Sequence, residues 1–281
     1  MRQVADEMFD LREHVPDGIV FKVERALELS LDLSTVAYGN DGDTAGYATS
    51  EGTWLRVQWR PRWRLAEQAW TGAEAASVLR GVARPELLRS MRWADQDRDV
   101  VWKAEELTLI GSKAVAPNGT PTADPGLSDA WWVSLKTSLT ALAAHPTGRV
   151  GMGQEHLSLR IAEVYGGEVA TVVEEWTTAH ADLHWGNLTA PDCWLLDWED
   201  WGAGPRGLDA ATLWGFSLGV PALADRVLAE FADDLATRSG RLAQLLFCAN
   251  VERAFRRSGR EMPFTGPAIE AGKRLLSELP A

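Results

Sequence analysis

Hydrophobic and polar residues alternate along three short runs in the first third of the chain. These runs cover residues 34–38, 45–50 and 53–58. Glycine fills the breaks between them, with Asn and Asp beside it in the first break, at residues 39–43. Such residues supply the positive φ angles that tight hairpin turns need. The pattern therefore predicts an antiparallel meander.

After the meander, the spacing of the apolar residues becomes helical. Residues 72–88 place Ala76 and Leu79 on one face, which predicts a helix. Residues 99–107 are typical of one more strand. Residues 110–127 are rich in Gly, Pro and Asn and have no periodicity, so they predict a connector.

Helical spacing dominates the rest of the chain. Ser128 can cap a helix and Pro146 can stop it. The apolar face of that helix would hold Trp131, Trp132, Leu135, Leu139 and Leu142. Residues 221–280 predict three more helices, broken near Gly240 and at 259–267.

A sheet-rich front and a helical back predict an α+β fold with two lobes. We expect a small N-terminal lobe with an antiparallel sheet at residues 1–108 and a larger, mainly helical C-terminal lobe at residues 109–281. Ligands commonly bind in the cleft between such lobes.

The composition narrows the choice of partner. The chain has 281 residues, 46% of them hydrophobic, which suits one two-lobed enzyme. Its 28 basic and 40 acidic residues give a formal net charge of −12, which repels polyanions, so we expect no nucleic-acid partner. The negative charge favours a cationic ligand or serves solubility alone, and both interpretations stay open.

Cysteine usage and hydropathy indicate a cytoplasmic protein without a membrane partner. Cys193 and Cys248 lie far apart and form no metal-spaced pair, so we expect reduced core thiols instead of a disulfide scaffold or a thiolate zinc site. Residues 1–15 contain no unbroken apolar region for export, and no run approaches the roughly 18 apolar residues of a membrane span.

The stretch with the clearest chemical signal covers residues 178–214. Asp182 is followed by Asn187, and Asp197 comes ten residues after that. Phosphoryl transfer to an alcohol needs one carboxylate to orient the hydroxyl and accept its proton, and oxygen ligands that hold Mg²⁺ on the nucleotide phosphates. A hairpin that turns at residues 191–192 would bring Asp197 beside Asn187, so that both could share one metal ion.

Residues 180–187, H-A-D-L-H-W-G-N, resemble the H-x-D-x-x-x-x-N catalytic loop shared by protein kinases and the aminoglycoside phosphotransferase family. That family's loop is typically followed by D-W-E or D-W-D, and this chain has D-W-E-D-W-G-A-G-P-R-G-L-D-A-A at residues 197–211. The lobe order agrees along most of the chain. The resemblance implies a bilobal protein-kinase-like fold and a kinase that uses ATP or GTP with Mg²⁺ to phosphorylate a hydroxyl group.

The resemblance also implies a role for individual residues of this stretch. Asp182 corresponds to the catalytic base, and Asn187 and Asp197 correspond to the Mg²⁺ ligands. His180 is expected to brace the loop, and Asp209 to hold the loop's backbone.

The acceptor is specified by the resemblance only as a small hydroxylated molecule. The family includes kinases of aminoglycosides, other antibiotics, choline, sugars and amino-acid alcohols. Family and charge together favour an antibiotic or an amino sugar, which is a cationic substrate. Glu199 and Asp200 are expected either to touch this substrate or to support the site.

The front lobe matches the family less closely. Arg56 stands where the family often has a Lys that bridges the nucleotide phosphates and a helical glutamate, for which Glu74 is the candidate here. Gly39 and Gly42 either cover the phosphates or form a plain hairpin turn. Glu105, Glu106 and Leu107 fall where the family's hinge offers backbone groups to the purine. Lys103 is a second candidate for the cation.

Three alternatives accompany this interpretation. A pseudokinase that binds nucleotide or a partner without turnover is kept open by Arg56. The spacing of His180 and His184 matches H-E-x-x-H zinc peptidases, but Ala181 removes their glutamate base. The basic run at residues 60–64 either clamps phosphates or is a solvated turn.

Tryptophan is abundant, with 14 residues, and five of them surround the proposed site. These five are Trp185, Trp194, Trp198, Trp201 and Trp214. They form either an aromatic wall for a sugar ring or part of the core.

Overall fold

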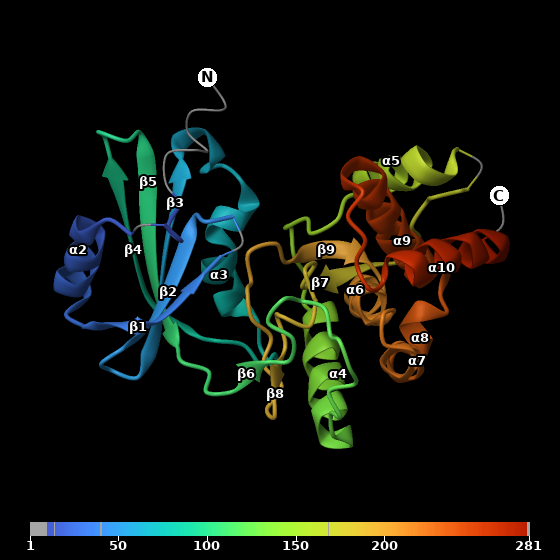
Figure 1. Cartoon of the computed structure of the whole chain (residues 1–281), viewed down its shortest axis with the longest axis horizontal. Coiled ribbons are helices and arrows are strands. Elements are labelled where there is room, and N and C mark those ends of the chain that lie inside the picture. Colours follow the sequence, from blue (N-terminus) through green and yellow to red (C-terminus); the bar gives the residue numbers. More distant parts are fainter. Residues whose placement is uncertain (1–9, 14, 40, 168, 280–281) are drawn as a thin grey trace. The chain divides into compact units, whose positions relative to one another are not determined.

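The computed structural model describes residues 10–13, 15–39, 41–167 and 169–279, which form two compact units (Figure 1). Unit 1 comprises the described residues of 1–77 and 85–111. Unit 2 comprises residues 78–84 and the described residues of 112–281. No helix in these described ranges is both long and apolar enough to cross a membrane.

Unit 1 is built on a five-stranded antiparallel sheet with the strand order β1-β2-β3-β5-β4 (Figure 1). The strands are β1 (Leu31–Tyr38), β2 (Thr44–Thr49), β3 (Thr53–Pro61), β4 (Leu87–Asp95) and β5 (Val100–Thr108). The predicted meander is confirmed as β1 to β3, and the predicted fourth strand is confirmed as β5. Buried residues are concentrated in β2, β3 and β5, whereas the edge strands β1 and β4 are mostly exposed.

Helix α2 (Asp17–Leu27), which the sequence pattern did not predict, covers apolar residues of this sheet. Its Ile19, Val23 and Leu27 are buried in one cluster with Leu55 of β3 and Trp102 of β5. The core of unit 1 therefore lies between α2 and the sheet.

The helix predicted at residues 72–88 is wrong for most of its length. Only α3 (Gly72–Ala75) is α-helical, a 3₁₀ turn, η3 (Ala76–Val78), follows it, and β4 begins at Leu87. Gly81 has a φ of +73°, and Pro85 disfavours helical geometry in the residue before it. Ala76 and Leu79 are nevertheless buried, so the apolar pattern reports burial and not a helix.

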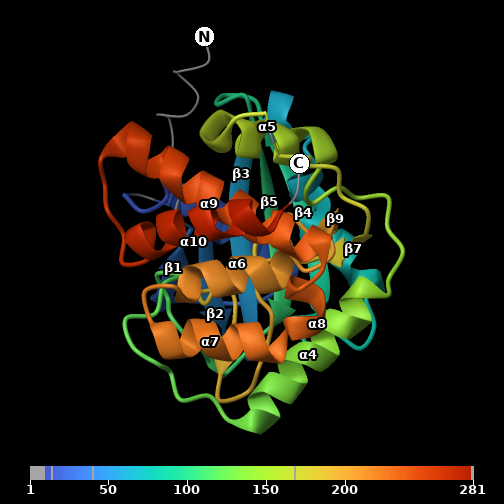
Figure 2. The same cartoon turned by 90° about the vertical axis from the view of Figure 1, so that its right-hand side faces the viewer.

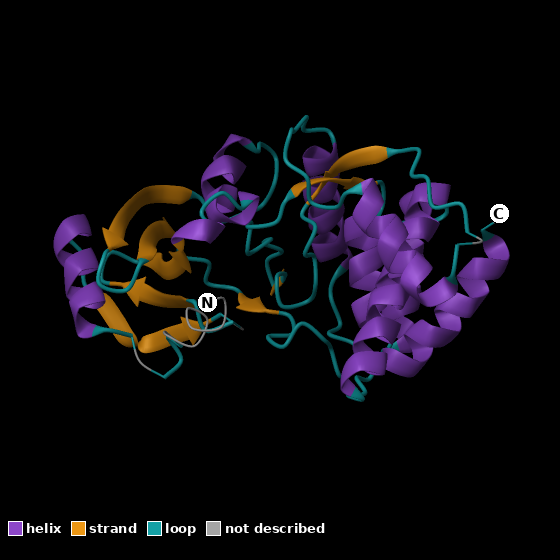
Figure 3. Cartoon of the chain, turned by 90° about the horizontal axis from the view of Figure 1, so that it is seen from above, coloured by secondary structure: helices purple, strands orange, loops and turns teal. Residues whose placement is uncertain are grey.

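Unit 2 is mainly helical (Figures 2 and 3). Its helices are α4 (Asp129–Ala143), α5 (Gln154–Tyr165), α6 (Leu208–Ser217), α7 (Pro221–Glu230), α8 (Ala232–Leu235), α9 (Arg238–Ser258) and α10 (Thr265–Glu278). Its short strands form two pairs, β6 (Lys113–Ala114) with β8 (Thr189–Ala190) and β7 (Trp176–Ala179) with β9 (Gly202–Pro205). Helix α9 contacts α5, α6 and α10, so it forms the centre of the helical layer.

The predicted cap of α4 is confirmed. The Ser128 side chain accepts a hydrogen bond from the Trp131 N–H at 3.2 Å, and the helix ends at Ala143, before Pro146. Trp131 and Trp132 are buried and pack against the ring of Trp185 from the candidate site. Helix α4 therefore supports the loop that contains Trp185.

Both cysteines are buried free thiols in unit 2, as the sequence predicts. Burial raises the pKa of Cys193 to about 12. Burial also raises the pKa of Cys248 to about 12. Both groups therefore stay protonated at neutral pH.

Candidate active site

The loop at residues 180–187 connects β7 to β8 in unit 2 and brings together two residues of the proposed site. The Asn187 side-chain amide donates one hydrogen bond to the Asp182 carbonyl oxygen at 2.9 Å and one to its Oδ2 atom at 3.2 Å. Since the amide N–H groups point at Asp182, the Oδ1 atom of Asn187 is the end of the side chain that can bind a cation.

The predicted hairpin returns the chain to this loop. Leu188 and Leu195 form an antiparallel bridge, and the Leu196 N–H donates to the Asn187 carbonyl oxygen at 2.8 Å. Asp197 follows Leu196 directly and has a φ of +60° with an exposed side chain. The hairpin thus places the backbone of Asp197 next to that of Asn187, as expected from the sequence.

The carboxylates of this region repel one another. Burial raises the pKa of Asp182, and the negative charges of Asp197 and Asp200 raise it further, while His184 and His180 oppose the shift. The Asp182 side chain is partly buried, and its carboxylate and the charges of Asp197 and Asp200 together create a negative potential that a divalent cation would relieve. The region therefore fits a hard cation with oxygen ligands, the kind that Mg²⁺ represents.

Asp209, in the first turn of α6, holds the start of the loop. Its carboxylate accepts hydrogen bonds from the backbone N–H groups of His180 at 2.7 Å and Ala181 at 2.9 Å. Ala181 has a φ of +68°, a conformation that costs a non-glycine residue about 1–3 kcal/mol unless its surroundings impose it. Asp209 is buried, and this burial raises its pKa. Its two hydrogen bonds are well placed to impose the strained turn just before Asp182.

His180 links the loop to the hairpin. His180 is fully buried, and its Nε2 atom lies 2.8 Å from the Leu196 carbonyl oxygen. Its ring packs edge to face with the Trp198 ring, with 4.7 Å between the ring centres. His184 makes separate contacts, with its Nε2 atom 3.8 Å from Asp182 Oδ2. Residues 180–184 are not helical, so the geometry of the H-x-x-x-H zinc motif is not formed.

Arg149 supports the segment after Asp197 and was not found by sequence reasoning. Its guanidinium donates to the carbonyl oxygens of Trp201 and Glu199, each at 2.8 Å, and lies 4.9 Å from the centre of the Trp201 ring. Asp200 is exposed between these two residues. An isolated Arg after a proline-containing loop carries no motif, so its role emerges only from the fold.

The tryptophans around the site mostly fill the core. Trp185, Trp198, Trp201 and Trp214 are buried, whereas Trp194 is partly exposed. This burial favours the core interpretation over an aromatic wall for a sugar ring.

In unit 1, Arg56 of β3 lies opposite Glu105 of β5. Its guanidinium contacts Glu105 Oε2 at 2.7 Å, and Lys103 Nζ contacts Oε1 of the same carboxylate at 2.8 Å. Glu105 and Lys103 are fully buried. Although burial opposes ionisation, the two cations lower the pKa of Glu105.

The expected partnership of Arg56 with Glu74 is therefore corrected. Glu74 accepts a hydrogen bond from the Ser90 hydroxyl at 3.0 Å and pairs with Arg92, both in β4. Strand β4 begins at Leu87, where the predicted helix would end, and its Arg92 is the cation that pairs with Glu74. Glu105, two strands away in sequence but adjacent in the sheet, supplies the carboxylate for Arg56.

The structure places Glu105, Glu106 and Leu107, for which a hinge role was expected, within a central strand, and their contact with a purine stays a prediction. All three lie inside β5, which pairs with β3 on one side and β4 on the other, so the sheet ladders use the backbone of this stretch. Glu106 acts through its side chain, which accepts from Arg89 Nε at 2.6 Å and from the Thr53 hydroxyl at 2.8 Å. The strand ends only at Thr108.

Gly39 and Gly42 form a hairpin turn between β1 and β2. The Gly42 N–H donates to the Gly39 carbonyl oxygen at 3.2 Å, and Gly42 has a φ of +72°. A side chain at Gly42 would collide with Asp10. The turn therefore requires glycine at position 42, and contact of Gly39 and Gly42 with phosphates stays a prediction.

Comparisons with known proteins show which fold the sheet of unit 1 and the helices of unit 2 form. No protein-family model and no curated protein matches the sequence. Solved structures do match: an amicoumacin kinase, hAmiN, in complex with AMP-PNP, Ca²⁺ and Ami has a TM-score of 0.57 at 12% identity, covering 96% of each chain.

Two aminoglycoside phosphotransferases give similar values. The phosphotransferase APH(4)-Ia has a TM-score of 0.58 at 11% identity, over 92% of this chain and 96% of that one. A GDP complex of aminoglycoside 2'-phosphotransferase-IIIa has a TM-score of 0.53 at 12% identity, over 94% and 99%. The chain therefore has the protein-kinase-like fold of these small-molecule kinases, with the sheet in unit 1 and the helices in unit 2, as expected.

Proposed function

We propose that the protein is a small-molecule kinase that transfers the terminal phosphate of ATP or GTP to a hydroxyl group. The observation that carries this proposal is the arrangement of Asp182, Asn187 and Asp197. The Asn187 amide donates one hydrogen bond to the Asp182 carboxylate and one to the Asp182 carbonyl oxygen, and the hairpin holds Asp197 against the backbone of the same loop.

Asp182 acts as the base in this proposal. It orients the acceptor hydroxyl and takes its proton as the hydroxyl oxygen bonds to the terminal phosphorus and the bond from that phosphorus to the bridging oxygen breaks. The products are a phosphate monoester and a nucleoside diphosphate. The raised pKa of Asp182 suits a group that must accept a proton.

Asn187 and Asp197 are the proposed Mg²⁺ ligands. In the described part of the chain, no three His, Cys, Asp or Glu side chains converge on a ready metal centre. Mg²⁺ commonly takes only one or two carboxylates and completes its shell with phosphate oxygens and water, so a pair of side chains suffices. The ion would neutralise charge on the phosphates.

In unit 1, Arg56 is the proposed contact to the nucleotide phosphates. Glu105 fixes its guanidinium by two hydrogen bonds, from Nε at 3.1 Å and Nη2 at 2.7 Å. This support differs from the helical glutamate that the resemblance implies. A pseudokinase, which binds nucleotide without turnover, would not need Asp182, Asn187 and Asp197 as base and metal ligands. Because the chain has all three residues, the pseudokinase is the weaker alternative.

Replacing Asp182 by Asn tests the proposal. The substitution preserves shape but removes the base, so turnover should fall by roughly 10²–10⁴ with little change in nucleotide affinity. Transfer from labelled ATP or GTP and calorimetry of nucleotide binding are the measurements. Asp225→Asn, an exposed carboxamide substitution on α7, is the matched control and should be active.

Asp197→Ala separates the two assigned roles. It should weaken nucleotide binding as well as turnover, and a chelator should weaken nucleotide binding to the wild type. Phosphate transfer by Asp182→Asn at the wild-type rate, or nucleotide binding indifferent to Mg²⁺, would contradict the proposal.

A further inference from the structure

A cavity of about 350 Å³ opens beside the loop of unit 2 that contains Asp182. Ala181, the residue before the proposed base, lines it, together with residues of α6, α9 and the segment before α10. Its volume falls within the range of about 300–1,000 Å³ that is common for small-ligand sites.

Aromatic contacts connect this cavity to the proposed base. His184 Nε2 lies 3.8 Å from Asp182 Oδ2, and the His184 ring meets the edge of Phe216, a lining residue, at 5.7 Å. Phe216 in turn lies 5.2 Å from Phe247 and 5.3 Å from Phe264, measured between ring centres. Phe216, Phe247 and Phe264 therefore form an apolar wall of the cavity, and His184 lies between this wall and Asp182.

The charge of the wall differs from the charge of the whole chain. Arg260 is the one charged side chain among the described residues that line the cavity, and none of them is Asp or Glu. Asn250 and two threonines provide its other polar side chains. An ammonium group placed on this wall would be desolvated without a carboxylate partner and would be repelled by Arg260, which is unfavourable.

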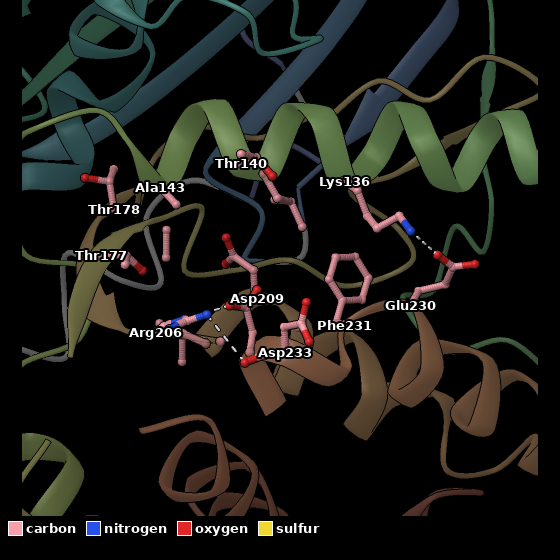
Figure 4. Close-up of a pocket in the computed structure, with 16 residues that line it drawn as sticks. Lys136, Thr140, Ala143, Thr177, Thr178, Arg206, Asp209, Glu230, Phe231 and Asp233 are labelled. Atoms are coloured by element: carbon pink, nitrogen blue, oxygen red, sulfur yellow. Dashed lines mark hydrogen bonds and ion pairs between the residues drawn. The ribbon is translucent and has the colours of Figure 1, made fainter. Parts of the chain in front are cut away.

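A second cavity in unit 2, of about 400 Å³, has the opposite character (Figure 4). Its acidic lining residues are Asp209, Glu230, Asp233 and Asp234. Their charges are largely used: Lys136 pairs with Glu230, Arg206 pairs with Asp234, and Asp209 holds the loop backbone. No residue from 180 to 187 lines this cavity, so it is not the place where a hydroxyl would meet Asp182.

We propose that the cavity at Ala181 binds the acceptor and selects a hydroxylated molecule with an apolar body and no positive charge, with Arg260 favouring one that carries an acidic group. The inference rests on the proposed kinase function, in which Asp182 receives the hydroxyl proton and a nucleoside triphosphate supplies the phosphate. It replaces the cationic amino sugar that net charge and resemblance favour, because the local wall, and not the total charge, contacts the acceptor.

Three probes with one shared body test the selection. They are naphthalenes with one hydroxymethyl group and, at the far end, a carboxylate, a neutral methyl group or an aminomethyl group. Binding is measured by calorimetry in the presence of Mg²⁺ and a non-hydrolysable ATP analogue, and phosphate transfer is measured with labelled ATP and GTP. Kanamycin serves as a polycationic comparison.

The acidic and neutral probes should bind at least tenfold more tightly than the aminomethyl probe, and kanamycin should receive no phosphate. Arg260→Glu should reverse the order of the acidic and aminomethyl probes. Arg257→Glu changes the net charge equally but lies outside the lining, so it should keep the wild-type order. Phe247→Ala should weaken all three probes to a similar extent.

The outcomes separate this inference from the proposed function. Absence of Mg²⁺-dependent nucleotide binding in the wild type contradicts the kinase proposal itself. With nucleotide binding intact, the inference is overturned if the aminomethyl probe or kanamycin is preferred, if no probe binds, or if Arg260→Glu and Arg257→Glu behave alike. Melting curves of each variant confirm that the protein is folded, and Arg260→Gln, a milder change, should abolish the preference for the acidic probe.

Discussion

At the scale of single residues, Asp209 shows how the geometry of a loop can depend on a side chain from another element. Its carboxylate satisfies two backbone N–H groups and fixes the positive φ of Ala181. A buried N–H group that loses its partner costs about 1–3 kcal/mol. The geometry of Asp182 is therefore coupled to a residue of α6.

Asp209→Ala should lower the free energy of unfolding by roughly 2–5 kcal/mol, because it removes the acceptor of one buried and one partly buried N–H group. Chemical denaturation monitored by tryptophan fluorescence measures this change. Asp209→Asn retains one acceptor oxygen and should lose less. Equal stability of Asp209→Ala and the wild type would show that the two hydrogen bonds do not hold the loop.

The buried group of Lys103, Glu105 and Arg56 yields a second prediction at this scale. Lys103 Nζ also donates to the Trp70 carbonyl oxygen at 2.6 Å, so Lys103 is fixed within unit 1. Lys103→Met should destabilise the protein by about 3 kcal/mol, because it leaves the buried Glu105 carboxylate with Arg56 as the one remaining cation of this group. Denaturant unfolding is the measurement, and Lys113→Met, at an exposed position, is the control.

Acid unfolding provides an independent check of the same group. Since the pKa of Glu105 in the folded state lies below its ordinary value of 4.5, its contribution to stability is present above that value and is lost as the pH falls through the lower folded-state pKa. Glu105→Gln should therefore flatten the acid limb of the stability profile. An unchanged acid limb would contradict the assignment.

At the scale of elements, the start of α4 is determined by a local capping signal, Ser128. Ser128 satisfies the Trp131 N–H, and Asp129 adds a negative charge in the first turn, where the helix dipole favours it. Ser128→Ala should lower the free energy of unfolding by about 1 kcal/mol. Ser134→Ala, a substitution inside the same helix, is the control, and a loss no larger than that of the control would exclude a capping role.

Elements with local signals were predicted, whereas those that depend on distant partners were not. Local turn residues predict two of these features. Pro191 and Asp192 mark the hairpin, and Gly259 marks the end of α9. Strand β4 is an edge strand that mixes apolar residues with Arg89 and Arg92, and the carboxylate partners of these arginines lie in β5 and α3. No periodicity within β4 reveals those partners.

At the scale of the whole molecule, the sequence predicted the two-part fold, and it proposed the residues that the loop and the hairpin bring together. Asp182, Asn187 and Asp197 lie close together in sequence, so one loop and one hairpin suffice to place them. The partner of Arg56 could not be predicted, because Glu105 meets it only through the strand order β3-β5-β4. Neither could the cavity at Ala181, whose lining residues come from segments that meet only in the folded unit.

The buried thiols provide a way to observe one unit at a time. Both cysteines of the chain belong to unit 2, and a pKa about three units above the ordinary value of 9.0 reduces the reactive thiolate roughly thousandfold. Alkylation by iodoacetamide at pH 8 should therefore be slow until unit 2 opens, which mass spectrometry can time. Rapid labelling of the native protein would contradict the burial of these thiols. Because unit 1 contributes no thiol, the labelling rate reports the opening of unit 2 alone. Comparison of this rate with the rate of global unfolding tells whether the two units unfold in one cooperative transition.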